Sequence, residues 1–327
     1  MVLPRAERNA AFRTRLLGAA AFTAALFLTL WVIFFLRRPL ILVGDPLFDS
    51  LYGEKRTEWK LRFCSLRLFR PVKYLSMNTA AGPDLIAASI WAASRRPAGV
   101  LAPYRYREGA ARYLAEHPGA PVAVLGGRYT PPDGAAYGTE TAGEYGAGAP
   151  AWFSSAFGND LYLAGRCAAL IALDKEAKRA EGDTAGAETI SFYAGDSSPA
   201  VREAFIRGLR DSSWPGTPLA GEGERPSACA VFAGQGDEFF DGGVKKQPLI
   251  LMNWADPRSF PPSTVMVFDD SPWAQLPEAF ALLRGGVKTA VISSKISVFR
   301  TPALDSALYR EIKKLKTLSF GEENADN

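Results

Sequence analysis

The stretch ISFYAGDSSPAVREAFIRGL (190–209) contains one complete unit of an α/β fold. With Thr189 before it, the run to Ala194 is apolar and rich in β-branched and aromatic residues, which predicts a buried strand. Pro199 then begins a segment with apolar residues at 201, 205 and 209, the spacing of a helix with one buried face. A short polar loop at 195–198 joins the two and follows the carboxyl end of the strand.

The same alternation extends on both sides of this unit. Short apolar runs predict strands at 40–44, 72–77, 99–102 and 121–125 before it, and at 228–233, 249–253 and 264–268 after it. Helical patterns stand between them, to about residue 70 and at 83–93, 108–116, 159–175 and 278–284. This order predicts parallel sheets covered by helices, and two successive series predict two doubly wound lobes. Residues 126–150, rich in Gly, Ala, Pro and Tyr, predict a long surface loop or lid between them.

An uncharged run, LLGAAAFTAALFLTLWVIFFL (16–36), precedes the first strand. As a helix it spans roughly 30 Å, the thickness of a hydrocarbon core. Four arginines lie before it and two after it, so residues 1–15 are expected in the cytoplasm and the rest outside. A cleaved signal peptide is the alternative, but its apolar region is shorter and ends in small residues, whereas this one ends in WVIFFL. We therefore expect a single-pass anchor in the cytoplasmic (inner) membrane and a periplasmic C-terminal domain.

Charge and composition exclude several classes of protein. The formal charge is +4, but residues 1–38 hold six arginines and one glutamate, so the remainder is near neutral and no nucleic-acid partner is expected. One basic stretch, 55–73, suits either anionic headgroups or a solvated helix face. Cys64, Cys167 and Cys229 have no CxxC spacing and are expected to be buried thiols. With His117 as the single histidine, no metal site or cofactor is predicted.

Candidate ligand residues gather where predicted strands end. Aromatic faces stand there beside side chains with paired donors or acceptors, a combination that suits a small polar ligand in a cleft. Ligands of doubly wound sheets bind at these carboxyl ends. The candidates are Asp45, Phe48, Arg128, Asp160, Arg202, Gln235, Trp254, Asp269 and Asp270. The pair Asp269–Asp270 is also suited to acid–base chemistry or to hydrogen bonding within a loop, but no catalytic motif accompanies it.

Six stretches resemble the type I periplasmic-binding-protein superfamily, which includes ribose and galactose binding proteins and the ligand domain of lac-repressor-like regulators. They are VGDPLFDSLYG (43–53), VAVLGGRY (122–129), FGNDLYLAGRCAALIAL (157–173), residues 190–209, AVFAGQGDEFFDG (230–242) and VMVFDDSPWAQLPEAFALLRGG (265–286). The resemblance implies that Asp45 and Phe48 contact the ligand and that Arg128 and Arg202 stand at the family's ligand arginines. It places Asp269 or Asp270 at a polar contact position.

The chain departs from the family's pattern at two contact positions. Gly126 or Gly127 stands where the family has an aspartate, and Gly236 where it has an asparagine. Each ligand hydroxyl left unpaired in a closed cleft costs about 1–3 kcal/mol, so a simple pentose or hexose is not expected. The family's DNA-binding helix-turn-helix has no room in the roughly 15 residues before the anchor, which excludes a repressor.

The sequence thus predicts two lobes of a solute-binding protein. Lobe 1 is expected to span 39–156 and about 270–295, and lobe 2 to span 157–268 and about 296–318, with hinges near 154–159, 266–270 and 292–298 and a disordered tail at 319–327. The expected role is capture of a sugar-like or nucleoside-like solute for an ABC-type permease or a sensor membrane protein, without catalysis. Two alternatives stay open: a structural or interaction ectodomain with a degenerate cleft, and a hydrolase that uses Asp269 and Asp270.

Overall fold

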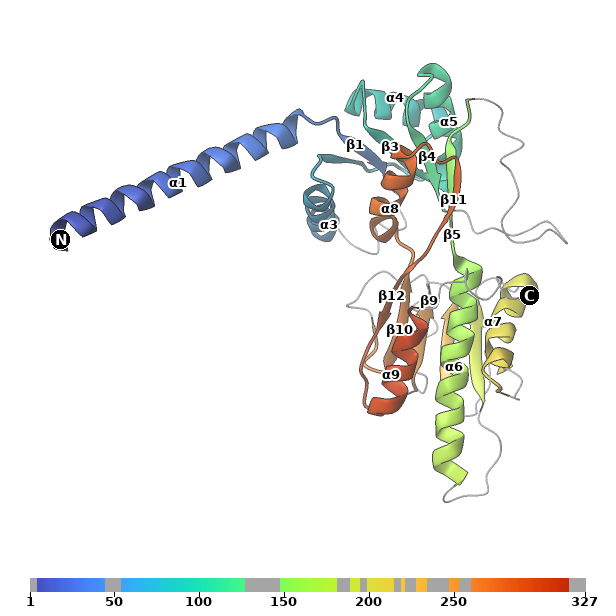
Figure 1. Cartoon of the computed structure of the whole chain (residues 1–327). Coiled ribbons are helices and arrows are strands. Elements are labelled where there is room, and N and C mark those ends of the chain that lie inside the picture. Colours follow the sequence, from blue (N-terminus) through green and yellow to red (C-terminus); the bar gives the residue numbers. More distant parts are fainter. Residues whose placement is uncertain are drawn as a thin grey trace.

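The computed structural model shows an α/β protein of two lobes with one long N-terminal helix, α1 (Arg5–Leu36), which projects from the upper lobe (Figure 1). It describes residues 5–44, 54–126, 148–180, 189–194, 199–214, 219–220, 228–233, 247–252 and 260–317. This architecture confirms the predicted fold class.

The upper lobe contains a sheet of six strands in the order β11-β5-β4-β3-β1-β2. All of its strand pairs are parallel. The central strands are buried along their whole length, because helices cover both faces, and this is why they appear in the sequence as continuous apolar runs. The strands are β1 (Leu40–Val43), β2 (Val72–Leu75), β3 (Gly99–Pro103), β4 (Val122–Leu125), β5 (Ala151–Ser155) and β11 (Thr289–Ile292).

The lower lobe contains a second sheet in the order β12-β10-β9-β8-β6-β7. Its pairs are parallel except that β12 runs antiparallel to β10. This exception arises because β12 follows β11 directly across the gap between the lobes and enters the second sheet from its carboxyl edge. The strands are β6 (Ile190–Ala194), β7 (Leu219–Ala220), β8 (Cys229–Ala233), β9 (Leu249–Met252), β10 (Thr264–Asp269) and β12 (Lys295–Val298).

Helices cover the sheets. In the upper lobe α4 (Pro83–Ala93) and α5 (Arg107–Glu116) lie on one face, with the short 3-10 turn η1 (Tyr104–Tyr106) before α5, and α3 (Glu54–Arg67) and α8 (Pro272–Arg284) on the other. In the lower lobe α6 (Phe157–Ala180), α7 (Pro199–Asp211) and α9 (Ser306–Leu315) share the largest hydrophobic core with one face of the second sheet.

The chain passes between the lobes three times. β5 leads through Ala156 into α6, β10 leads through Asp270 and Ser271 into α8, and β11 leads through Ser293 and Ser294 into β12. We call these the first, second and third crossings. Since β5 and β10 each leave their sheet at the carboxyl end toward the other lobe, the carboxyl ends of the two parallel sheets face one another.

Several boundaries differ from the sequence prediction. α6 extends to Ala180, and β10 continues to Asp269, so the predicted hinge at 266–270 overlaps a strand. Most of the predicted loop at 126–150 lies outside the described residues, as do the tail at 319–327 and residues 1–4. β5, β7, β11, β12 and α9 were not predicted. β11 (TAVI) has only three consecutive apolar residues, and β12 (KISV) alternates polar and apolar residues.

Within α1, the segment Leu17–Leu36 has 20 residues, a mean hydropathy of 2.3 and none of its length buried in the protein. Its length and composition are those of a membrane-spanning helix or of a signal sequence.

Candidate functional site

The described strand ends converge on the space between the lobes. Residues predicted to bind ligand stand at the ends of strands β1, β4, β6, β8, β9 and β10. The carboxyl ends of these strands point into the space between the lobes. Asp160, Arg202, Asp269 and Asp270 belong to the described residues, whereas Asp45, Phe48, Arg128, Gln235 and Trp254 lie outside them.

Arg202 lies in the first turn of α7, the helix that follows β6, and its side chain is exposed. Among the described residues no carboxylate pairs with it. An exposed guanidinium group offers paired donors of the kind that a ligand arginine uses.

Asp269 ends β10 and shapes the second crossing. Its Oδ1 accepts a hydrogen bond from the backbone N–H of Ser271 at 3.0 Å. Burial raises the pKa of the Asp269 carboxyl, while Ser271 opposes this shift. Ser271 in turn caps α8, where its Oγ accepts from the N–H of Ala274 at 3.4 Å. These contacts give Asp269 the role of a turn residue.

Asp160 connects the first crossing to the third. Its side chain is 1% exposed, and Ser294 Oγ donates a hydrogen bond of 2.6 Å to its Oδ2. Burial raises the pKa of the carboxyl to about 7; the Ser294 hydrogen bond lowers it and the charge of Asp270 raises it further. The carboxyl thus lies among the crossings, and its contact is with the protein itself.

An aromatic pair that the sequence analysis missed lies where β1 ends. A Cβ atom on Gly44 would lie 2.2 Å from the hydroxyl oxygen of Tyr74, so this tyrosine occupies the place that a side chain at 44 would need. The Tyr74 ring lies 5.3 Å, centroid to centroid, from Trp273 at the start of α8. The Tyr74 ring thus lies against Gly44, the residue that precedes Asp45 in the chain. The available signal was a glycine directly after one strand and a tyrosine near the end of the next.

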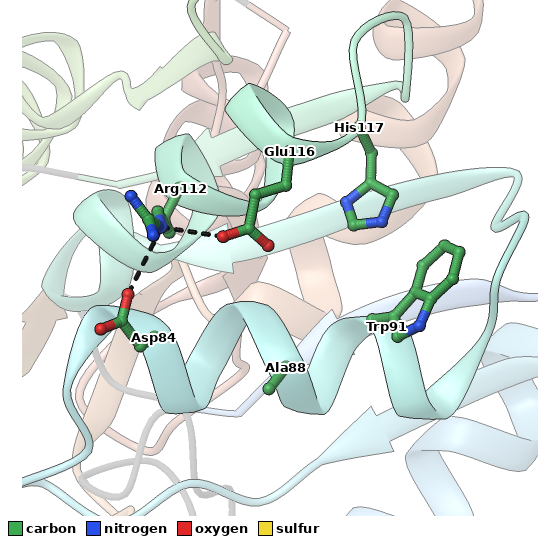
Figure 2. Close-up of a pocket in the computed structure, with 6 residues that line it drawn as sticks. All are labelled: Asp84, Ala88, Trp91, Arg112, Glu116 and His117. Carbon is green, nitrogen blue, oxygen red and sulfur yellow. Dashed lines mark ion pairs between the residues drawn. The ribbon is translucent and has the colours of Figure 1, made fainter.

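A separate pocket of about 490 Å³ lies between α4 and α5 (Figure 2). Arg112 Nε lies 3.4 Å from Asp84 Oδ1 and 2.8 Å from Glu116 Oε1. The His117 ring stacks on Trp91 with centroids 4.3 Å apart, and its Nδ1 lies 3.0 Å from the Tyr113 carbonyl oxygen. The polar groups of this pocket satisfy one another on the outer face of the upper lobe, so we do not assign the ligand site to it.

The three cysteines are free and buried, as predicted. Burial raises the pKa of each thiol, that of Cys229 to about 12, so the neutral form dominates. The described residues contain no group of three or more His, Cys, Asp or Glu placed to hold a metal ion.

Comparison with known proteins identifies the fold. No protein-family model and no curated protein matches the chain. Among solved structures, an ABC transporter solute-binding protein from Conexibacter woesei DSM 14684 matches with a TM-score of 0.56 and 13% identity, over 86% of this chain and 95% of that one. A solute-binding protein of an ABC transporter system from Aeropyrum pernix K1 matches with a TM-score of 0.50 and 12% identity, over 86% and 90%.

A similar structure also occurs in a protein whose role is not described as solute binding. A transcriptional activator of the comK gene from Bacillus halodurans matches with a TM-score of 0.53 and 10% identity, over 86% of this chain and 97% of that one. The chain therefore shares the two-lobed α/β fold of these solved structures. Since one fold hosts several functions, the function has to be argued from the site.

Proposed function

We propose that this protein is a membrane-tethered, extracytoplasmic solute-binding protein that takes a small polar ligand, sugar-like or nucleoside-like, between its lobes. The observation that carries the proposal is the apposition of the two sheets: their carboxyl ends face each other across three crossings. Ligands of open α/β sheets bind at such ends. Closure about the crossings would then enclose the ligand.

The proposed ligand contacts are the residues of the strand ends. Arg202 and Asp270 come from described elements, and Asp45, Phe48, Arg128, Gln235 and Trp254 follow described strands. Asp160 and Asp269, also predicted to bind, are assigned to the support of the crossings because their carboxylates contact Ser294 and Ser271. The proposed lobe 1 comprises residues 39–156 and about 270–295. The proposed lobe 2 comprises residues 157–268 and about 296–318.

The proposed partners are an ABC-type permease or a sensor protein in the same membrane. Two of the similar structures are described as solute-binding proteins of ABC transporter systems, which supports a transport role. The exposed apolar helix α1 supports an uncleaved anchor that holds the lobes outside the cytoplasmic membrane. The proposed role includes no chemistry.

A second candidate is an interaction ectodomain whose cleft no longer binds solute. Gly126, at the end of β4, has φ +78, and its N–H bonds to the Phe153 carbonyl oxygen at 2.9 Å. This left-handed backbone disfavours an L side chain, so an aspartate at 126, one of the two candidate positions 126 and 127, would be strained.

A thermal-shift screen of the full chain in detergent, against sugars, nucleosides, amino acids and polyols, tests the proposal. A ligand at one hundred times its Kd adds about 2.7 kcal/mol of stability, or roughly 5–10 °C in melting temperature. Arg202→Ala is expected to abolish this shift and to leave the melting temperature of the empty protein nearly unchanged, because the side chain is exposed.

The matched control is Arg210→Ala, an exposed arginine in the last turn of the same helix, which should bind like the wild type. Wild-type affinity in Arg202→Ala would remove this residue from the site. A well-folded protein that responds to no compound in a broad library would favour the interaction ectodomain.

A further inference from the structure

Helix α3 has two opposite apolar faces. Its inner face, formed by Thr57, Leu61 and Cys64 at helical spacing and continued by Leu68 just after the helix, is buried or half-buried and packs toward α8. On the opposite side Trp59, Phe63 and Leu66 are 72%, 65% and 71% exposed. These three residues, spaced i, i+4 and i+7, form one stripe, which we call the outer face.

Basic side chains flank the outer face. Lys60 and Arg67 lie on one side of the stripe and Arg62 on the other, and all three are exposed. The whole helix contains five basic and two acidic residues. An exposed Trp and Phe between lysines and arginines is the pattern of a helix that lies in the headgroup region of a bilayer.

The end of α1 is fixed beside the end of α3. Arg37 Nη1 donates to the Phe69 carbonyl oxygen at 3.3 Å, and Arg70 Nη1 donates to the Arg38 carbonyl oxygen. The Phe34 and Phe69 rings lie 5.9 Å apart, centroid to centroid. α3 therefore lies at the level where the apolar segment Leu17–Leu36 ends.

The orientation of α3 agrees with this position. In Figure 1, α3 runs across the direction of α1, on the side of the upper lobe to which α1 projects, and α8 lies beside it on the side away from α1. Because the inner face turns toward α8, the outer face turns toward the side that α1 occupies.

A cluster of arginines completes the junction. Burial and the charges of Arg37, Arg284 and Arg38 lower the pKa of Arg70. Among the described residues no carboxylate pairs with these four side chains. A cluster of like charges beside the end of an apolar helix is complementary to lipid phosphates.

We propose that α3 docks onto the bilayer that α1 enters, with Trp59, Phe63 and Leu66 among the acyl-chain ends and the arginine cluster on anionic headgroups. The inference rests on the proposed membrane placement of α1 and goes beyond it. Two elements then hold the upper lobe to the membrane surface, so ligand-driven closure moves the lower lobe.

Brominated lipids, which quench nearby tryptophan fluorescence, test this docking in the full chain reconstituted into vesicles. Trp31 reports insertion of α1, and Trp59 reports docking of α3. Bromine atoms near the headgroup end of the acyl chains should quench both. In the Trp31→Phe variant the quenching of Trp59 should remain, and in the Trp59→Phe variant the quenching of Trp31 should remain. The double variant should show neither signal. Trp91→Phe, on the far helix layer, serves as the control and should leave the quenching unchanged.

The outcomes separate the two proposals. If Trp31→Phe shows no more quenching than the double variant while Trp59→Phe is still quenched, α1 inserts and the docking of α3 is refuted. If Trp59→Phe shows no more quenching than the double variant, the anchor itself is refuted.

Docking further predicts that Phe63→Ser with Leu66→Ser reduces the quenching of Trp59 alone. It also predicts that vesicles with phosphatidylglycerol quench Trp59 more strongly than vesicles of phosphatidylcholine only.

Discussion

Asp160 is the residue whose chemistry is most altered by the fold. Folding removes its carboxyl from water, and the hydrogen bond from Ser294 compensates for only part of that loss. The sequence analysis listed this residue among the candidate ligand contacts. A buried carboxyl with a protein partner is a supporting residue, and the burial depends on the third crossing, more than 130 residues away in the chain.

The titration of Asp160 predicts a pH dependence of stability. The folded protein holds the proton up to about pH 7, whereas the unfolded chain releases it near the ordinary value of 3.8. The folded state therefore binds more protons between these values, and the free energy of unfolding falls as pH rises through this window. The full loss, reached above pH 7, is on the order of 4 kcal/mol.

Asp160→Asn should remove this component, since the amide is neutral and its oxygen can still accept from Ser294. Melting temperatures measured from pH 4.5 to 8 should fall less steeply in the variant than in the wild type. Asp84→Asn removes an exposed carboxylate and controls for the loss of one charge. Parallel profiles for wild type and Asp160→Asn would contradict the prediction.

At the scale of elements, the closest approach is between α6 and α7. A Cβ on Gly165 would lie 2.3 Å from the Phe205 carbonyl oxygen, and one on Gly208 would lie 2.1 Å from the Tyr162 carbonyl oxygen. Each glycine thus faces the backbone of the other helix, and the two helices share the main core of the lower lobe. Backbone atoms cannot move aside as a flexible side chain can.

Gly208→Ala should therefore force the two helices apart. We expect a loss of about 1–3 kcal/mol in the free energy of unfolding, the range for overpacked cores, measured by thermal or denaturant unfolding. Gly285→Ala is the control, because its added Cβ would meet nothing closer than 3.4 Å. Equal stability of the two variants would show that α6 and α7 pack more loosely than described.

The elements also show what a sequence can predict. Strands buried on both faces, such as Leu40–Val43, are visible because every residue is apolar. β11 (TAVI) has an apolar run of only three residues, which the sequence analysis did not select, and β12 (KISV) alternates polar and apolar residues. α9 was missed although Asp305 caps it and Leu308, Ile312 and Leu315 have helical spacing, a signal that was available. For the candidate site, the sequence could predict which residues stand at the ends of strands. It could not predict the contacts of Asp160 and Tyr74, because these contacts involve segments distant in the chain.

At the scale of the whole molecule, the three crossings form one connected unit. Ala156 in the first crossing donates its N–H to the Ile292 carbonyl oxygen at 3.0 Å, just before the third. Asp160 and Ser294 join the same two crossings through side chains. The second and third are joined by the ladder between β10 and β12, where Asp269 stands opposite Lys295. One crossing cannot bend without straining the contacts of the other two.

This coupling predicts that Ser294→Ala loosens the whole hinge. The variant leaves the Asp160 carboxyl buried without its donor, a change that costs about 1–3 kcal/mol. Hydrogen exchange should become faster at the backbone amides of Ala156, in the first crossing, and of Ile296, in β12 just after the third crossing, with little change in the core strand β8. Ser89→Ala, which removes a serine that bonds only within α4 to the Leu85 carbonyl oxygen, should leave both amides unchanged. Faster exchange at Ile296 alone would mean that the crossings bend independently, and the lower lobe would then have no single axis about which to close.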